Sequence, residues 1–326
     1  MSKSNFEEAQ AFNRRIQSRI ESGFTPDLRK LKKNEYFYKS FWRDPILADL
    51  YVGELSRTYI NLFKRYLPDG GTILDVGCGP GYFALELARA GFEVVGIDIA
   101  EDAISAASNA YSAAKKESDI APIKYKCMDP RELLLREPGV RYSGILSSGF
   151  LHHIPLINET ANDLALLLDF NGVLVIHEPQ HKVFTLESAF WISVIRNVLS
   201  LTKNWYQEFG NVSSEDSLST EAESVYLEYI FERDPEELHG QSPNDLSCDR
   251  EEILRALSFH FEILEDFPSR SFIYRTLGGL RGDDPKVHAL AKYLTLVDSY
   301  AVREGLLEAN YFFAVLQRMN LGVDVE

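Results

Sequence analysis

The chain has 326 residues, of which 45% are hydrophobic, so it can form a sizeable core in one large domain or in two. The formal net charge of -15 argues against nucleic acid as a substrate, because an acidic surface repels phosphate backbones. The polar first residues do not resemble a secretion signal, no apolar run approaches the ~20 residues that cross a bilayer, and the three cysteines form no disulfide framework.

The N-terminal part is predicted to be helical. Residues 4–20 follow an amphipathic pattern, a basic and aromatic stretch covers residues 29–42, and residues 45–66 return to helical spacing. The aromatic side chains between residues 36 and 42 can staple this segment to a core or cover a bound ligand. We expect residues 1–66 to form a helical segment that acts as a lid.

Short apolar strands then alternate with helices. This alternation predicts βαβ units, and therefore a parallel sheet with helices on both faces. The five predicted strands are residues 72–76, 93–97, 123–127, 142–147 and 172–176, and the helices between them are residues 82–90, 101–116 and 158–169.

The alternation stops after Glu178. Residues 184–247 are rich in aromatic and acidic side chains and are predicted to be an insertion that covers the substrate. Beyond it, residues 251–259 and 285–307 are predicted helices, and 261–267 and 311–317 are strands. The predicted organisation is a lid (1–66), a core (67–183), the substrate cover (184–247) and the completion of the core (248–326).

A glycine-rich turn follows the first strand. Gly77, Gly79 and Gly81 allow a tight turn and a close approach of ligand to backbone at the start of a helix. Asp98 ends the next strand, where a carboxylate accepts hydrogen bonds from ribose hydroxyls. The G-x-G-x-G spacing and the preceding Asp75 favour a cationic ligand over the pyrophosphate of a dinucleotide.

These motifs resemble those of the class I S-adenosylmethionine-dependent methyltransferases. The resemblance rests on DVGCGPG, GIDIAEDAISAA, KCMDPREL, GILSSGFLHHI and LLLDFNGVLVIHEP, which occur in the order and at the separations of that family. It implies a doubly wound, mostly parallel, seven-stranded Rossmann-like α/β sheet, with S-adenosylmethionine as cofactor. The cofactor-binding residues that it implies are Asp75, Gly77, Cys78, Gly79, Gly81, Asp98, Ile99, Met128, Asp129 and Ser147. Two polar residues of the lid, Tyr38 and Arg43, are further candidates for contact with the cofactor.

Candidate catalytic residues follow the fourth and fifth strands, because ligands bind at the carboxyl ends of the strands of such a sheet. A histidine is a suitable general base for a hydroxyl nucleophile, and a histidine that only packs or caps a helix is the alternative. The candidates for a base or for substrate positioning are His152, His153 and His177. The candidates for substrate contact are Ser148, Glu178, His181 and Trp191.

The stretch HEPQH, residues 177–181, has the spacing by which zinc peptidases bind their metal. That chemistry needs both histidines on one face of a helix. The stretch follows a predicted buried strand, and Pro179 disfavours helical geometry within it. We therefore predict no metal site.

The sequence predicts a cytoplasmic methyltransferase that methylates a small organic acceptor, with oxygen as the favoured target. A tRNA or protein methyltransferase is the first alternative, and a catalytically inactive cofactor-binding module is the second. A homodimer is left open.

Overall fold

The computed structural model describes residues 3–37, 39–68, 70–208, 212, 214–230, 242–245 and 247–320, without the side chains of residues 3, 4 and 181. No helix among them is long and apolar enough to span a bilayer. The predicted Tyr38 lies outside the described residues, and so does the side chain of His181.

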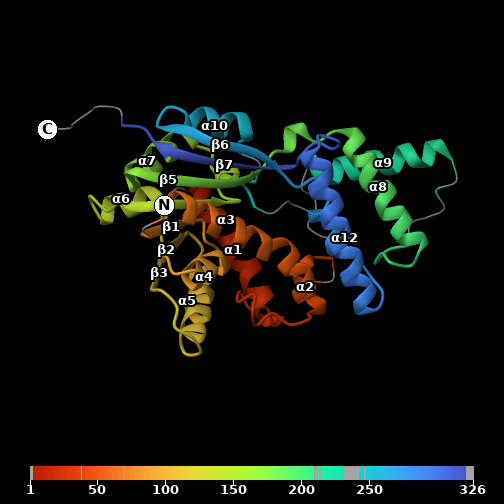
Figure 1. Ribbon diagram of the computed structural model, residues 1–326, viewed down its shortest axis with the longest axis horizontal. Helices are drawn as coiled ribbons and strands as arrows, with labels where there is room; N and C mark the ends of the chain where they lie inside the picture. Colours follow the sequence, from red (N-terminus) through yellow and green to blue (C-terminus); the bar gives the residue numbers. More distant parts are fainter. Residues whose placement is uncertain are drawn as a thin grey trace.

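A seven-stranded sheet forms the centre of the molecule (Figure 1). Its strand order is β3-β2-β1-β4-β5-β7-β6, and β7 runs antiparallel to both β5 and β6. The strands are β1 (Thr72–Val76), β2 (Glu93–Asp98), β3 (Ile123–Cys127), β4 (Tyr142–Ser148), β5 (Leu168–Pro179), β6 (Phe261–Ser269) and β7 (Tyr311–Arg318). The prediction of a doubly wound, mostly parallel α/β sheet is confirmed.

Helices cover both faces of this sheet, and each face has its own apolar core. One face carries α6 (Pro130–Arg136), α7 (Ile157–Leu167) and α10 (Arg250–Leu257). The other carries α3 (Glu54–Tyr66) and α4 (Tyr82–Arg89), and α5 (Glu101–Lys115) packs beside β2 and β3. The central strands are buried on both faces, as their continuous apolar sequences require.

The N-terminal segment packs against the open end of the sheet. It comprises α1 (Lys3–Glu21), the short turns η1 (Glu35–Phe37) and η2 (Phe41–Arg43), α2 (Pro45–Ala48) and the π-helical turn η3 (Asp49–Gly53). The long helix α1 contacts α5. Its residues line the same cavity as the turns that follow β1 and β2, so it lies at the carboxyl ends of these strands, where a ligand would bind.

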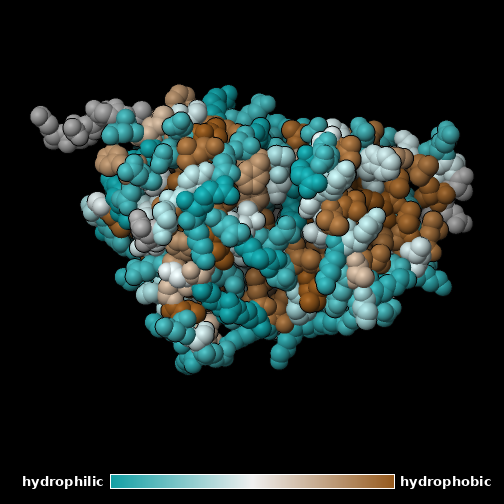
Figure 2. Space-filling view, in the orientation of Figure 1, coloured by the Kyte–Doolittle hydropathy of each residue, from teal (hydrophilic) through white to brown (hydrophobic). Residues whose placement is uncertain are grey.

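A second group of helices lies beyond the end of the sheet, on the right of Figure 1. It contains α8 (Leu186–Leu201), α9 (Glu215–Ile230), α11 (Tyr274–Leu277) and α12 (Asp284–Arg303). Figure 2 shows hydrophobic residues gathered at this end of the molecule. The exposed large apolar side chains of the molecule include several of α8, namely Leu186, Phe190, Trp191, Val198 and Leu201.

Most predicted bounds lie within two residues of the observed ones, and the larger differences concern β5 and α12. Strand β5 begins at Leu168, which pairs with Tyr142, so α7 ends at Leu167 and not at residue 169. The helix predicted for residues 285–307 ends at Arg303, shortly before the left-handed Gly305. Helix α6 was not predicted, although Asp129 and Pro130 form a suitable N-terminus for it.

Candidate active site

A large cavity opens at the carboxyl ends of the central strands. Its volume is about 780 Å³, which is the size of a pocket for a cofactor and a small ligand together. Helix α1 forms one wall, and the loops after β1, β2, β4 and β5 form the opposite side. Tyr51, Tyr274 and Tyr311 line it from three segments that are distant in the sequence.

The glycine-rich turn forms one end of the cavity. All three of its glycines have left-handed backbones, with φ values of 65° at Gly77, 51° at Gly79 and 83° at Gly81. A Cβ atom would collide with Phe150 at Gly77 and with Tyr125 at Gly81, whereas no atom lies within 4 Å of it at Gly79. Gly77 and Gly81 therefore permit close packing within the protein, and Gly79 leaves open space in the cavity wall.

Asp98 is held at the end of β2 by backbone donors. Its Oδ2 accepts from the N–H of Gly79 at 2.9 Å, and its Oδ1 accepts from the N–H of Ala100 at 2.8 Å. Each carboxylate oxygen keeps a second lone pair for a ligand hydroxyl. Burial raises the pKa of Asp98 although these hydrogen bonds oppose the shift.

Asp75 lies behind the turn and is fully buried. Burial, with the charge of Asp98, raises its pKa to about 8, so the carboxyl group is largely protonated at neutral pH. Its Oδ2 atom has no hydrogen-bond partner among the described residues.

Met128 and Asp129 line the cavity next to Asp98. One oxygen of Asp129 caps α6 by accepting from the N–H of Glu132, and the other lies 3.5 Å from the amide nitrogen of Asn5 in α1. Ile99 also lines this end of the cavity. Cys78 is buried and its thiol points to the carbonyl of Gly79, so its side chain faces the protein.

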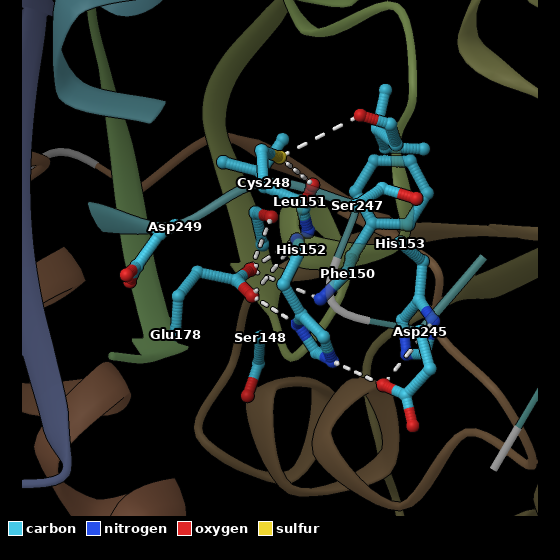
Figure 3. A network of polar contacts seen from close by, with 12 residues as sticks. Ser148, Phe150, Leu151, His152, His153, Glu178, Asp245, Ser247, Cys248 and Asp249 are labelled. Atoms are coloured by element: carbon cyan, nitrogen blue, oxygen red, sulfur yellow. Dashed lines mark hydrogen bonds and ion pairs between the residues drawn. The ribbon is translucent and has the colours of Figure 1, made fainter. Parts of the chain in front are cut away.

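A buried carboxylate organises the loop after β4 (Figure 3). Glu178, which is 0% exposed, accepts hydrogen bonds from the backbone N–H groups of Phe150 and Leu151, each at 2.9 Å. Its Oε2 lies 2.7 Å from Nδ1 of His152, while Ser147 lies 3.4 Å from its Oε1. A carboxylate at Nδ1 favours the tautomer with its proton on that atom, and Nε2 then carries the lone pair. Nε2 faces a second carboxylate, at 3.7 Å from Oδ1 of Asp245.

His177 occupies a different, apolar environment. Burial, aided by the charge of Arg270, lowers its pKa to about 3, so the ring is neutral. The ring stacks on Tyr311, with 5.3 Å between ring centroids, and its Nε2 has no hydrogen-bond partner among the described residues. Ser148 lies nearby and shares a hydrogen bond of 2.7 Å with the hydroxyl of Tyr59.

A family model for a methyltransferase domain matches residues 51–229, which is more than half of the chain. The chain belongs to this methyltransferase family. The resemblance to the methyltransferases that the motifs carried is thereby confirmed.

Three relatives illustrate how far the similarity extends. The chain is 42% identical over 67 residues to YqeM of Bacillus subtilis, 28% over 107 residues to the ubiquinone biosynthesis O-methyltransferase of Rhodopseudomonas palustris, and 34% over 103 residues to that of Chromobacterium violaceum. These matches cover 21%, 33% and 31% of this chain and 25%, 39% and 42% of the relatives. The similarity therefore spans less than half of each relative.

The solved structure of the [4+2]-cyclase SpnF resembles the methyltransferase over its whole length. The TM-score is 0.50 at 14% sequence identity, and the match covers 97% of this chain and 96% of that chain. At this identity the likeness concerns the fold alone.

The residues of the cavity fit S-adenosylmethionine. Gly79 leaves room for a ligand against the backbone, Asp98 presents two oriented oxygens, and Asp129 and Met128 lie beyond it. The individual roles of these residues stay predictions.

Several predicted site residues lie elsewhere. Arg43 points away from the cavity, because its guanidinium donates to the backbone carbonyls of Gly278 and Leu280. Trp191 is 46% exposed on α8 and does not line the cavity. Of the predicted substrate cover, Asn244 is the described residue that lines the main cavity. Arg43 and Trp191 therefore do not lie where the sequence predicted them, because sequence patterns do not show how these elements pack.

Other cavity residues were missed. Arg15 and Arg19 line it from α1, and Tyr51, Tyr274 and Tyr311 line it from three other segments. The spacing of the two arginines, four residues apart on an amphipathic helix, is a signal that they share one face. Nothing in the sequence marks the three tyrosines as neighbours.

Proposed function

We propose that this methyltransferase methylates a hydroxyl oxygen of a small organic acceptor, and that His152 takes the proton of that hydroxyl. The pair of His152 and Glu178 carries the proposal, since Glu178 orients the imidazole of a histidine that lines the cavity. When bound, the cofactor supplies an electrophilic methyl group on a sulfonium. The chain has to orient the acceptor, exclude water and accept one proton as the new carbon–oxygen bond forms.

The acceptor would lie at the aromatic end of the cavity. Phe41 stacks on Tyr51, with 4.8 Å between their ring centroids, and Tyr274 lies 5.9 Å from Tyr311. Burial raises the pKa of the Tyr51 hydroxyl, which therefore stays a neutral hydrogen-bond donor. Such walls suit a partly apolar, planar acceptor with polar substituents. The names of the ubiquinone O-methyltransferase relatives support oxygen as the target.

Arg19 is our candidate for binding the carboxylate of the cofactor, in place of Arg43. Its guanidinium lines the cavity and stands 5.8 Å from the centre of the Phe37 ring. Within the described part of the chain it forms no ion pair. A half-buried cation without a counter-ion favours an anionic ligand.

The other functions have less support. The chain carries a net charge of -15, which disfavours tRNA as an acceptor. The acceptor would have to enter a cavity of about 780 Å³, which favours a small molecule over a large protein. SpnF, a cyclase, has a similar fold, so fold alone does not fix the reaction. The His152–Glu178 pair supports transfer to a hydroxyl over a cofactor-binding module without catalysis. A homodimer stays a prediction.

The proposal is tested with a panel of hydroxylated aromatic and alicyclic compounds, using release of S-adenosylhomocysteine as the readout. We expect His152→Gln to lower turnover about 100-fold or more while the affinity for S-adenosylmethionine is unchanged. His288→Gln is the matched control, because Nε2 of His288 pairs with Asp44 at 3.2 Å outside the cavity. Equal turnover in both variants would remove His152 from the mechanism.

A further inference from the structure

Two histidines and a carboxylate converge beside the loop after β4 (Figure 3). Nε2 of His152 lies 3.7 Å from Oδ1 of Asp245, and Nδ1 of His153 lies 4.0 Å from the same oxygen. One ligand atom from each of the three residues lies within 4.8 Å of the other two. Their side chains are 7%, 10% and 8% exposed. The three atoms are thus close enough to share one ligand, and both histidines line the cavity.

Their spacing is that of ligands around an ion. Separations of 3.7 and 4.0 Å are too long for hydrogen bonds. Two ligands bound to one metal at ~2.1 Å stand roughly 3.0–3.4 Å apart in octahedral or tetrahedral geometry. The two measured separations exceed this range by 0.3 to 1.0 Å, and the two imidazole nitrogens lie within 4.8 Å of each other, so small side-chain rotations would bring the three atoms into coordination distance.

The surroundings of the histidines favour a cation as well. Nδ1 of His152 is occupied by Glu178, which is the carboxylate–histidine arrangement that orients a metal ligand. Nδ1 of His153 lies 3.2 Å from Oε1 of Glu8 in α1 and 3.2 Å from Oγ of Ser242, so an ion at this atom would take the place of these contacts and keep both oxygens close by. Within the described residues no lysine or arginine forms an ion pair with Glu8 or Glu178. Three carboxylates, those of Glu8, Glu178 and Asp245, surround two imidazoles, so they outnumber the positive charges that the imidazoles can supply, and a bound cation would balance the remainder.

We propose that His152, His153 and Asp245 bind one divalent transition-metal ion, such as Zn²⁺ or Co²⁺. Two imidazoles and one carboxylate are a ligand set that suits such ions. Three protein ligands leave coordination positions open toward the cavity, as in catalytic rather than structural metal sites. This proposal replaces the sequence-based prediction that the chain has no metal site.

The ion would stand where the proposed function places the acceptor hydroxyl, and the proposal rests on that function for its role. A hydroxyl bound to a divalent ion loses its proton more readily, so the ion would prepare the acceptor oxygen for methylation. Nε2 of His152 would then be a ligand and not the base. If no ion binds, His152 keeps the role of general base, and only the present proposal fails.

The test is a titration of the untagged, chelator-treated full chain with Co²⁺ and Zn²⁺, without cofactor and without acceptor. Calorimetry is expected to show one ion per chain, and Co²⁺ is expected to give a visible absorption band of a nitrogen- and oxygen-ligated ion. Asp245→Asn and His153→Gln should each weaken binding at least tenfold. Glu178→Gln should weaken it roughly 10–100-fold through the orientation of His152.

The control variant is His288→Gln, which removes an imidazole next to a carboxylate outside this group and should bind the ion like the unchanged chain. Circular dichroism checks that each variant is folded. The Co²⁺ absorption band is measured on the unchanged chain, so this part of the test does not depend on the folding of a variant. The absence of binding at millimolar Co²⁺ would overturn the proposal. Binding that is the same in Asp245→Asn, His153→Gln and the unchanged chain would overturn it too.

Discussion

The two ends of the cavity are built in different ways. The cofactor end consists of turns that directly follow β1, β2 and β3, and its residues stand in short motifs. The acceptor end takes Tyr51 from the N-terminal segment, Tyr274 from α11 and Tyr311 from β7. A backbone turn is specified by neighbouring residues, whereas a cavity wall of this kind exists only after the chain has folded.

The largest effect is expected at the cofactor end. Gly79→Arg would place a side chain in the open space of the glycine-rich turn, and we expect the affinity for S-adenosylmethionine to fall more than 100-fold, measured by calorimetry. Gly70→Arg is the matched control, because Gly70 also has a left-handed backbone, with φ of 83°, and no atom within 4 Å of a built Cβ. Both variants carry the same backbone strain, so similar losses of affinity would contradict the assignment.

The difference between the two ends of the cavity explains which features the sequence could predict. The strands β1 and β3 have the predicted bounds, and the turn at Gly77–Gly81 and Asp98 lie together, because alternating apolar strands and glycines are local signals. The sequence also predicted that HEPQH does not form a helix. In the structure β5 continues to Pro179, and successive residues of a strand face opposite sides. Trp191 is exposed, and the side chain of Arg43 turns toward the carbonyls of Gly278 and Leu280. Both positions depend on how distant elements pack, which no local pattern encodes.

The second-largest effect is expected at the loop after β4, between the two ends of the cavity. Glu178→Gln removes the charge that orients His152, and we expect kcat to fall roughly 10–100-fold with little change in the KM of the cofactor. The matched control is Glu265→Gln, which alters a carboxylate paired with Arg65 at 2.6 Å on the surface. Steady-state kinetics and thermal unfolding are measured for both. An equal loss of kcat and of thermal stability in the two variants would show that Glu178 has no special part in the reaction.

The third effect is on stability and depends on pH. The pKa of Asp75 is about 8 in the folded chain, above its usual value, so its proton is bound more tightly in the folded state. This contribution to the free energy of unfolding is complete below about pH 4 and is lost as the pH rises toward 8. Asp75→Asn cannot ionise and should lose less stability between pH 5 and pH 8, by roughly 1 kcal/mol or more, in urea unfolding without cofactor. The same pH dependence in both proteins would contradict the raised pKa.

The smallest effect is expected in the outer helices. Trp191→Ala should change kcat and KM less than about twofold, since Trp191 is 46% exposed on α8 and lies outside the cavity lining. Tyr274→Ala, at the acceptor end, is the comparison and should raise the KM of the acceptor. A larger change in the KM of the acceptor from Trp191→Ala than from Tyr274→Ala would indicate that the substrate contacts α8.

The most direct test follows the methyl group itself. The methyltransferase is incubated with S-adenosylmethionine that carries a ¹³C-labelled methyl group and with an acceptor that offers both a hydroxyl and an amine, and the product is examined by carbon–proton correlation NMR. The predicted result is a labelled methyl ether, formed by the unchanged chain and strongly reduced in His152→Gln. A labelled N-methyl product, or a methyl ether formed equally fast by His152→Gln, would contradict the account.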